Sequence, residues 1–323
     1  MPVAVPTQLP QWTRPQKTKV DLPWADIKTL DFAKYDQPGG EEALARELDE
    51  AIRDTGFFSL VNTGFEPDEV QRQYDIGQSF FDLPSEEKEK EQYAVDFSNG
   101  NYFGYKRPNE KTVRGTQVRD NVETLNIPKF IKSNEREPFH PHLEPFRDEI
   151  EAFSRVFRLF AIILELPEDY FSSRHEYEDP AEDHLRYMLY HPRSLADDES
   201  VERTWARAHT DFGSLTLLWS QNIAGLQVKT GSGEWRYVPP VDNGIICNVG
   251  DTLSFWSEGY LKSTIHRVTR PPEDQAHLKR QGLFYFVRPG NKVDITPAES
   301  PLLKRLGLLK ERKSSKPVTG LEV

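Results

Sequence analysis

Four residues in the second half of the sequence have the types and spacing of a metal site with an anion anchor beside it. His209 and Asp211 are separated by a single residue in AHTDFGSLTLLW. His266 follows in STIHRVTR, and Arg280 is the first residue of RQGLFYF. The residues around His209 and Asp211 favour a strand, on which residues two apart project to the same face. We therefore predict that these two side chains point together and that His266, in another strand-like run, supplies a third ligand.

The ligand types narrow the identity of the metal. Two imidazoles and one carboxylate on one face of an octahedral ion leave three positions open, which is typical of non-haem Fe(II) oxygenases. Zinc takes similar ligands tetrahedrally, so the ligand types alone leave zinc open. Arg280 favours iron, because a guanidinium is the bidentate partner for the far carboxylate of a chelating oxoacid.

Ordered segments over most of the chain, from about Leu30 to Pro289, resemble the Fe(II)/2-oxoglutarate-dependent dioxygenases of the isopenicillin N synthase-like superfamily. The segments include TGFFSLVNTG at 55–64, FFDLPSEEK at 80–88, LRYMLYHP at 185–192, HTDFGSLTLL at 209–218, NVGDTL at 248–253 and RQGLFYFVRP at 280–289. This resemblance implies a double-stranded β-helix, iron held by His209, Asp211 and His266, and 2-oxoglutarate held by Arg280 and Tyr190. It also implies that O₂ is consumed and that succinate and CO₂ accompany oxidation of a substrate C–H bond.

Two positions depart from the pattern of that family. Its cosubstrate anchor usually reads Arg-x-Ser, whereas this chain has Arg280-Gln281-Gly282, and Met188 stands where an asparagine is usual. Losing a hydrogen bond to a charged group costs about 1.5–3 kcal/mol, which weakens binding more readily than it abolishes it. We expect Gly282→Ser to tighten 2-oxoglutarate binding or to leave it unchanged.

The resemblance also indicates residues for the organic substrate. Tyr102, Phe103 and Tyr105 lie in a loop-rich region that borders the active-site mouth in the family, although packing under a long loop explains each of them equally well. Phe212 follows Asp211 directly, and Arg186 contacts substrate if its strand faces inward. Such aromatic pockets suit an apolar ring.

Three functions are compatible with these residues. The first is an Fe(II)/2-oxoglutarate oxygenase acting on a small organic molecule, in specialised metabolism. The second is an iron oxidase that uses no oxoacid, and the third is a binding protein without redox chemistry. The intact ligand set counts against the third, and Arg280 counts against the second.

The remaining sequence predicts an α+β fold with a mainly β core. Apolar residues repeat every four positions at Leu44, Leu48 and Ile52, which indicates an amphipathic helix over 41–55. A second helix is expected over 68–81, and a long supporting helix over 142–166. From His184 to Phe286, short strand-like runs alternate with turn residues, as a jelly roll requires.

Four segments follow from this pattern. Residues 1–20 are predicted to be an irregular proline-rich arm, 21–140 an N-terminal region, 141–290 the supporting helix and the catalytic jelly roll, and 291–323 a C-terminal helix and tail. We expect 21–290 to form one integrated globular unit.

Composition limits the partners. A net charge of −11 argues against a nucleic-acid or anionic-membrane surface. The single cysteine, Cys247, excludes an internal disulfide and is expected to be a buried thiol. No apolar run is long enough to span a bilayer, and no leader pattern begins the sequence, so a cytoplasmic enzyme for a small molecule is expected. The oligomeric state is not encoded in these patterns.

Overall fold

The structure is a computed structural model that describes residues 9–113, 115–135, 137, 139–152, 169–309 and 318–322. Within these residues, eight strands form a large sheet in the order β1-β2-β10-β7-β12-β5-β4-β3, and four form a small sheet in the order β6-β11-β8-β9. The strands of the large sheet are β1 Thr29–Asp31, β2 Phe57–Val61, β3 Gly104–Lys106, β4 Val122–Pro128, β5 His184–Tyr190, β7 Leu215–Trp219, β10 Ile245–Val249 and β12 Arg280–Val287. Those of the small sheet are β6 Thr204–His209, β8 Leu226–Lys229, β9 Trp235–Tyr237 and β11 His266–Thr269.

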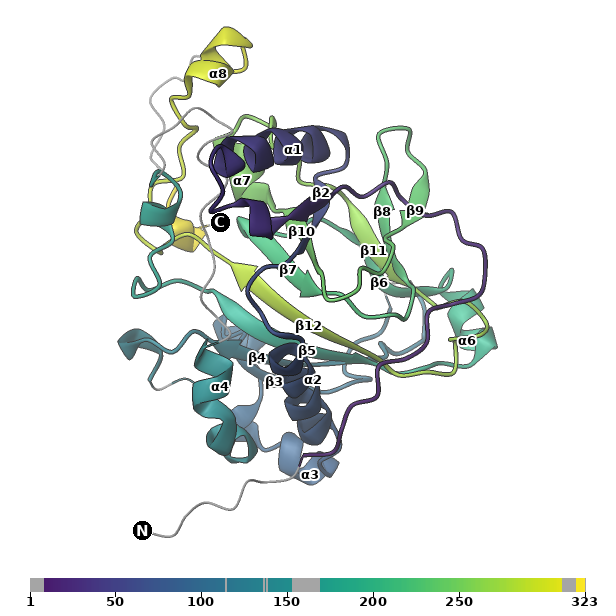
Figure 1. Cartoon of the computed structure of the whole chain (residues 1–323). Coiled ribbons are helices and arrows are strands. Elements are labelled where there is room, and N and C mark those ends of the chain that lie inside the picture. The colour runs from purple at the N-terminus through teal and green to yellow at the C-terminus, as the bar shows by residue number, and fades with distance from the viewer. Residues whose placement is uncertain are drawn as a thin grey trace.

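Helices lie around the two sheets (Figure 1). They are α1 Gly40–Asp54, α2 Pro67–Phe81, α3 Ser85–Lys88, α4 Arg147–Ala152, α6 Leu195–Ser200, α7 Asp251–Trp256 and α8 Pro301–Arg305. Short 3-10 helices are η1 Phe32–Lys34, η2 Glu91–Tyr93, η3 Phe97–Asn99, η4 Lys132–Asn134, η5 Pro141–Phe146, η6 Ser172–Arg174 and η7 Gly320–Glu322. Among the helices of the described ranges, none is long and apolar enough to cross a membrane.

The two faces of the large sheet have different surroundings. Along β12, Leu283, Tyr285 and Val287 join the main hydrophobic core on the helix side of the sheet. The alternate residues Phe284 and Phe286 line a cavity that side chains of the small sheet also line. The period of two along one strand therefore separates the structural core from the interior between the sheets.

The α+β fold with a mainly β core is confirmed, and the two facing sheets form the jelly roll. In α1, the predicted stripe of Leu44, Leu48 and Ile52 is fully buried, and the helix packs against β2. Helix α2 begins with Pro67 after a capping box between Glu66 and Glu69, as its sequence favours.

The predicted supporting helix and the C-terminal segment differ from the structure. The supporting helix predicted over 142–166 begins with a 3-10 turn, because Pro145 lacks the amide hydrogen that an α-helix needs there. Only α4 follows it in the described ranges, and the rest of that prediction, residues 153–168, lies outside them. The C-terminal segment contains the short α8, whose Leu303 is buried in the main core, and residues 310–317 are not described.

The described part of the N-terminal arm, residues 9–20, forms no helix or strand but is firmly packed. The ring of Trp12 stacks on that of Tyr74 in α2 at 4.1 Å, and the Trp12 amide donates to the Asp75 carboxylate. Farther along, Trp24 forms a bridge with Tyr237 at the edge of the small sheet. The described part of the arm and the residues just after it therefore link the helix layer to the small sheet.

Candidate active site

His209 and His266 come together because their strands pair. His209 ends β6, His266 begins β11, and the two residues are direct partners across the antiparallel pair. Their ring centroids are 4.4 Å apart. Asp211 faces both rings, with its Oδ1 atom 3.7 Å from Nε2 of each histidine. One ligand atom from each of the three residues lies within 4.8 Å of the others, a spacing at which one metal ion could be held.

Asp211 does not lie on the predicted strand. Strand β6 ends at His209, and the chain then crosses from the small sheet to β7 in the large sheet. The Asp211 carbonyl accepts the amide of Asp251, and Gly213 passes so close to β12 that a Cβ there would lie 2.5 Å from the Val287 carbonyl oxygen. The carboxylate therefore reaches the histidines from a crossover turn and not through strand alternation.

Backbone carbonyls orient the two imidazoles. His209 donates from Nδ1 to the Arg207 carbonyl at 2.7 Å, and His266 donates from Nδ1 to the Thr264 carbonyl at 3.1 Å. Because a carbonyl only accepts, both Nδ1 atoms carry the hydrogen, and both Nε2 atoms present a lone pair toward Asp211. This tautomer is the one a metal ligand needs.

The second carboxylate oxygen of Asp211, Oδ2, also has hydrogen-bond partners. Its Oδ2 atom accepts hydrogen bonds from Thr216 at 2.7 Å and Asn248 at 2.8 Å, which leaves Oδ1 facing the histidines. Burial alone raises the pKa of Asp211, but nearby His266 and these two donors outweigh it, so the pKa lies below its usual value. Burial lowers the pKa of His266, which favours its neutral form. The donor set thus favours the protonation states that bind a cation.

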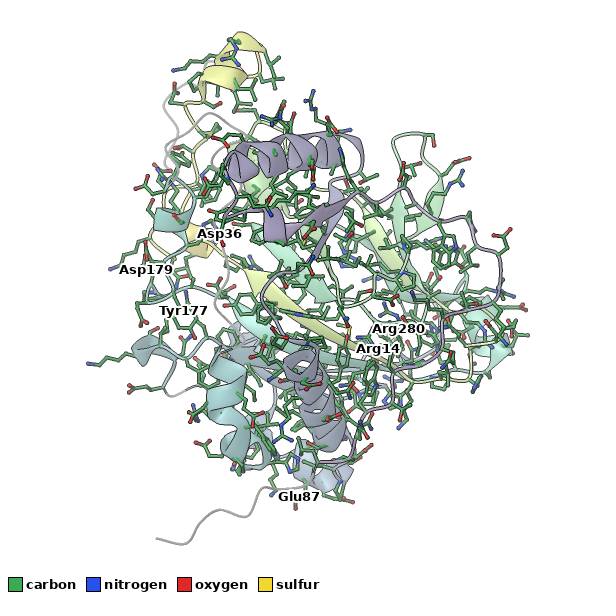
Figure 2. All side chains as sticks on the ribbon, viewed as in Figure 1. Arg14, Asp36, Glu87, Tyr177, Asp179 and Arg280 are labelled. Atoms are coloured by element: carbon green, nitrogen blue, oxygen red, sulfur yellow. The ribbon has the colours of Figure 1, made fainter. Side chains whose placement is uncertain are left out.

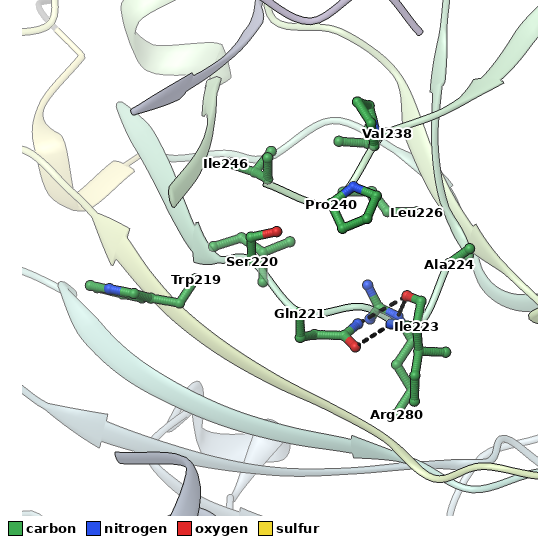
Figure 3. Close-up of a pocket in the computed structure, with 13 residues that line it drawn as sticks. Trp219, Ser220, Gln221, Ile223, Ala224, Leu226, Val238, Pro240, Ile246 and Arg280 are labelled. Atoms are coloured by element: carbon green, nitrogen blue, oxygen red, sulfur yellow. Dashed lines mark hydrogen bonds between the residues drawn. The ribbon is translucent and has the colours of Figure 1, made fainter. Parts of the chain in front are cut away.

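Arg280 is a buried cation whose guanidinium is incompletely satisfied. Arg280 is the first residue of β12, it pairs with Tyr190 of β5, and it is 3% exposed. Figure 3 shows the guanidinium beside Gln221 and Ile223, and its Nε donates to the Ile223 carbonyl at 3.4 Å. Nη1 is buried without a hydrogen-bond partner, and no carboxylate among the described residues forms an ion pair with this arginine. A buried cation of this kind suits an anionic ligand.

The two departures from the family pattern lie opposite each other. Gly282 of β12 pairs directly with Met188 of β5. A Cβ on Gly282 would lie 2.5 Å from Cε2 of Phe284, so the phenylalanine ring occupies the space into which a serine side chain would extend. Met188 lines the same cavity and supplies no strong hydrogen-bond donor.

The candidate metal ligands and Arg280 line one cavity of about 80 Å³ between the sheets. Its wall is mostly apolar and aromatic, and it includes Arg186 and Tyr190, both predicted site residues. The other lining residues are Phe57, Met188, Ala206, Thr216, Leu218, Leu226, Ile246, Asn248, Val268, Phe284 and Phe286. The structure therefore brings the candidate metal ligands, Arg280, Arg186 and Tyr190 around one space.

The predicted aromatic residues are distributed unevenly. Phe212 is 66% exposed, and Tyr102 is 52% exposed and contacts Phe97. Phe103 is half-buried, with its ring 6.2 Å from that of His184. These three residues do not line the cavity itself.

Tyr105 points elsewhere. It is 3% exposed, packs edge-on against Phe80 in the main core and donates its hydroxyl to Glu123. The interpretation of Tyr105 as packing is the one that matches its position, because alternation along β3 sends its side chain to the helix side of the sheet.

Three polar residues near the cavity were not predicted. Asn248 follows the buried run Ile245-Ile246-Cys247, and strand alternation from Ile246 would have placed it on the cavity face. His184 lies two residues before Arg186 on β5, and the same rule would have found it. Asn126 on β4 touches Arg186 through a cross-strand register that the sequence does not reveal.

Comparison with known proteins places this geometry in a family. Residues 27–145 match the family model described as the N-terminal region of non-haem dioxygenase in morphine synthesis, and residues 181–289 match the 2OG-Fe(II) oxygenase superfamily. The chain belongs to the 2OG-Fe(II) oxygenase superfamily. The protein is accordingly a non-haem dioxygenase whose cofactor is Fe(II) and whose cosubstrates are 2-oxoglutarate and O₂.

Individual relatives cover most of the chain. The UPF0676 protein C1494.01 of Schizosaccharomyces pombe is 32% identical over 84% of each chain. Homoarginine-6-hydroxylase 2-ODD-233 of Oryza sativa subsp. japonica is 30% identical over 76% of this chain and 80% of its own. Among solved structures, full-length Neurospora crassa T7H in complex with alpha-KG and thymine is 26% identical in sequence. The match covers 93% of this chain and 96% of the T7H chain, with a TM-score of 0.74.

Proposed function

We propose that this oxygenase oxidises a C–H bond of a small organic substrate in specialised metabolism, with iron held by His209, Asp211 and His266. In this proposal Arg280 binds the far carboxylate of 2-oxoglutarate, and Tyr190 lies beside it. The observation that carries the assignment is the convergence of two Nε2 lone pairs and one carboxylate oxygen within 4.8 Å, in a cavity that is also lined by Arg280, whose Nη1 is buried without a partner.

The residues divide the work. The two histidines and Asp211 fix the ion, and Asn248 and Thr216 hold the carboxylate in place. Bound Fe(II) supplies the activation of O₂ that C–H oxidation requires. The guanidinium of Arg280 fixes one end of the oxoacid, while the apolar wall limits access of water to the reacting centre.

A small organic substrate agrees with the names of relatives. Homoarginine-6-hydroxylase acts, by its name, on a small metabolite, and the Neurospora crassa protein binds thymine.

An oxidase that uses no oxoacid is the second candidate. Met188 and Gly282 favour it, because each removes a polar group that usually contacts the oxoacid. Arg280 favours the oxygenase, since an oxidase without an oxoacid leaves its buried Nη1 without an anion.

The test is anaerobic titration with Fe(II) and then with 2-oxoglutarate. The expected result is that His209→Ala, Asp211→Ala and His266→Ala each abolish tight iron binding and turnover of 2-oxoglutarate to succinate, while circular dichroism shows a retained fold. His277→Ala is the matched control, because His277 is exposed and outside the cavity. Near-normal iron binding in any one ligand variant removes that residue from the ligand set, and iron binding without 2-oxoglutarate binding favours the oxidase.

A further inference from the structure

Arg186 is the second cation of the cavity, and two polar neighbours fix its direction. It stands on β5, where its Nε donates to Oδ1 of Asn126 at 2.7 Å and its Nη2 donates to Nε2 of His184 at 3.2 Å. The guanidinium carbon also lies 4.5 Å from the ring centre of Phe286. These contacts leave Nη1 without a hydrogen-bond partner among the described residues.

His184 acts on this arginine as a neutral acceptor. Its Nδ1 donates to the Glu182 carbonyl at 2.9 Å, so the Nε2 atom that faces Arg186 carries the lone pair. Burial, together with the charge of Arg186, lowers the pKa of His184 to about 3. Burial also lowers the pKa of Arg186, to about 10, which still leaves it protonated at neutral pH. The pair therefore presents one positive charge and not two.

That charge has no counter-charge once the cofactors are bound. The two positive charges of Fe(II) and the one of Arg280 are balanced by the two carboxylates of 2-oxoglutarate and that of Asp211. Within the described part of the chain, no carboxylate forms an ion pair with Arg186. The charge of Asp211 acts on it without direct contact, and the charge of Arg288 opposes that effect. A partly buried cation in an apolar wall is costly unless an anion accompanies it.

The surroundings of Arg186 also define a shape. The ring of His184 stacks on that of Phe286 at 4.9 Å, and Phe286 stacks on Phe284 at 5.9 Å, with interplanar angles of 22° and 14°. These stacked rings form an aromatic wall beside the guanidinium, against which the flat apolar body of a ligand can pack.

We propose that the substrate is a compact monocarboxylate with a flat apolar body, whose carboxylate pairs with Arg186 and whose body lies against Phe286 and Phe284. This inference rests on the proposed oxygenase function, because the charge balance includes iron and 2-oxoglutarate. Asn126 is a positioning residue in this arrangement. Its Nδ2 donates to the Tyr102 carbonyl at 2.6 Å, so one amide connects the arginine to the neighbouring loop.

The test compares matched acids and amides. Benzoate, phenylacetate and cinnamate are each titrated against their carboxamides into full-length protein loaded with Zn(II) and 2-oxoglutarate, and binding is followed by ligand-observed NMR. We expect at least one acid to bind about tenfold more tightly than its amide, because only the acid carries the charge that pairs with Arg186. Arg186→Gln is expected to remove that difference, and Arg186→Lys to keep part of it.

Arg267→Gln is the matched control. Arg267 likewise donates from Nε to a side-chain amide, Gln227, and lies over an aromatic ring, Trp235, but it does not line the cavity. The acid preference is expected to survive this substitution. Equal affinity for acids and amides, binding of none of the acids, or an acid preference that persists in Arg186→Gln overturns the proposal. Binding of Zn(II) and 2-oxoglutarate, measured in the same samples, shows separately whether the proposed function holds.

Discussion

Restoring the serine of the usual cosubstrate anchor is expected to weaken the protein unless Phe284 is changed as well. From the sequence alone, Gly282→Ser adds a hydroxyl that tightens 2-oxoglutarate binding or leaves it unchanged. In the structure, the Cβ of that serine lies 2.5 Å from Cε2 and 3.1 Å from Cζ of Phe284. Both distances are shorter than ordinary carbon contacts, so the ring must move before the serine fits.

The steric cost of the serine and the hydrogen bond that it could add have similar magnitudes. Overpacking a well-packed interior costs about 1–3 kcal/mol. A new hydrogen bond to the charged carboxylate contributes about 1.5–3 kcal/mol at most. The steric cost is present with and without ligand, so it lowers the free energy of unfolding and cancels from the binding free energy. Because the Phe284 ring crowds the serine, its hydroxyl is not expected to reach the carboxylate, and the single variant is expected to bind 2-oxoglutarate about as tightly as the wild type. Replacing Phe284 by alanine in the same chain removes the obstruction, so the double variant is expected to bind 2-oxoglutarate about tenfold more tightly than Phe284→Ala alone.

The assay is a double-mutant cycle over Gly282→Ser and Phe284→Ala. Anaerobic calorimetry with 2-oxoglutarate gives the binding term, and urea unfolding of the protein without cosubstrate gives the stability term. A single Gly282→Ser variant that gains affinity with no loss of stability would refute the reasoning, since it would mean that the Phe284 ring does not occupy the serine position.

Three further perturbations test other parts of the structure. Arg280→Lys is expected to raise the 2-oxoglutarate requirement by about tenfold or more in steady-state kinetics with little change for the organic substrate, because lysine keeps the charge but loses the fork; the reverse pattern would reassign Arg280 to substrate. Asn248→Ala removes one of the two donors to Asp211 and is expected to weaken iron binding by about 10–100-fold in an anaerobic titration; unchanged affinity would show that this donor does not orient the ligand. Glu123→Gln is expected to destabilise the protein by about 3–5 kcal/mol at pH 7 in urea unfolding, because it leaves the buried ammonium of Lys88 without its counter-charge. Burial raises the pKa of Glu123, but hydrogen bonds from its neighbours bring it below its ordinary 4.5, so this contribution is complete above that pH and the gap to wild type shrinks as the pH falls below it; a gap that is constant down to pH 3 would contradict the ion-pair explanation.

Local periodicity was sufficient for much of the fold. The four-residue repeat in α1 and the period of two along β12 each report one buried face, and that information lies within a few turns or strand positions. Predicting the 3-10 helix at 141–146 would have required weighing the position of Pro145 within the segment. The helical repeat of apolar residues around Pro145 pointed instead to an α-helix. Short-range patterns therefore predicted elements better than their ends.

The site depended on pairings that cross long stretches of sequence. His209 meets His266 because β6 pairs with β11, whereas the family resemblance implied only that both histidines hold iron. Asn126 meets Arg186 through the register of β4 with β5, and no motif carries that information. Tyr105 shows a further limit of sequence, because its nearness to Tyr102 and Phe103 does not indicate which face of β3 it occupies.

Arg280, the proposed cosubstrate anchor, is held in part by the N-terminal arm, for which the sequence predicted no regular structure. In the N-terminal arm, Arg14 donates to the Ser220 carbonyl, and the Gln16 carbonyl accepts from the side chain of Gln275. That glutamine also accepts the amide of Ala224, next to Ile223, whose carbonyl accepts from Arg280. Figure 2 labels Arg14 and Arg280 in the same part of the molecule, and both charges act on the hydroxyl of Tyr74. The irregular arm thus packs behind the 220–224 turn and restrains the carbonyl that orients Arg280, which gives a proline-rich segment without periodicity a direct part in holding the site.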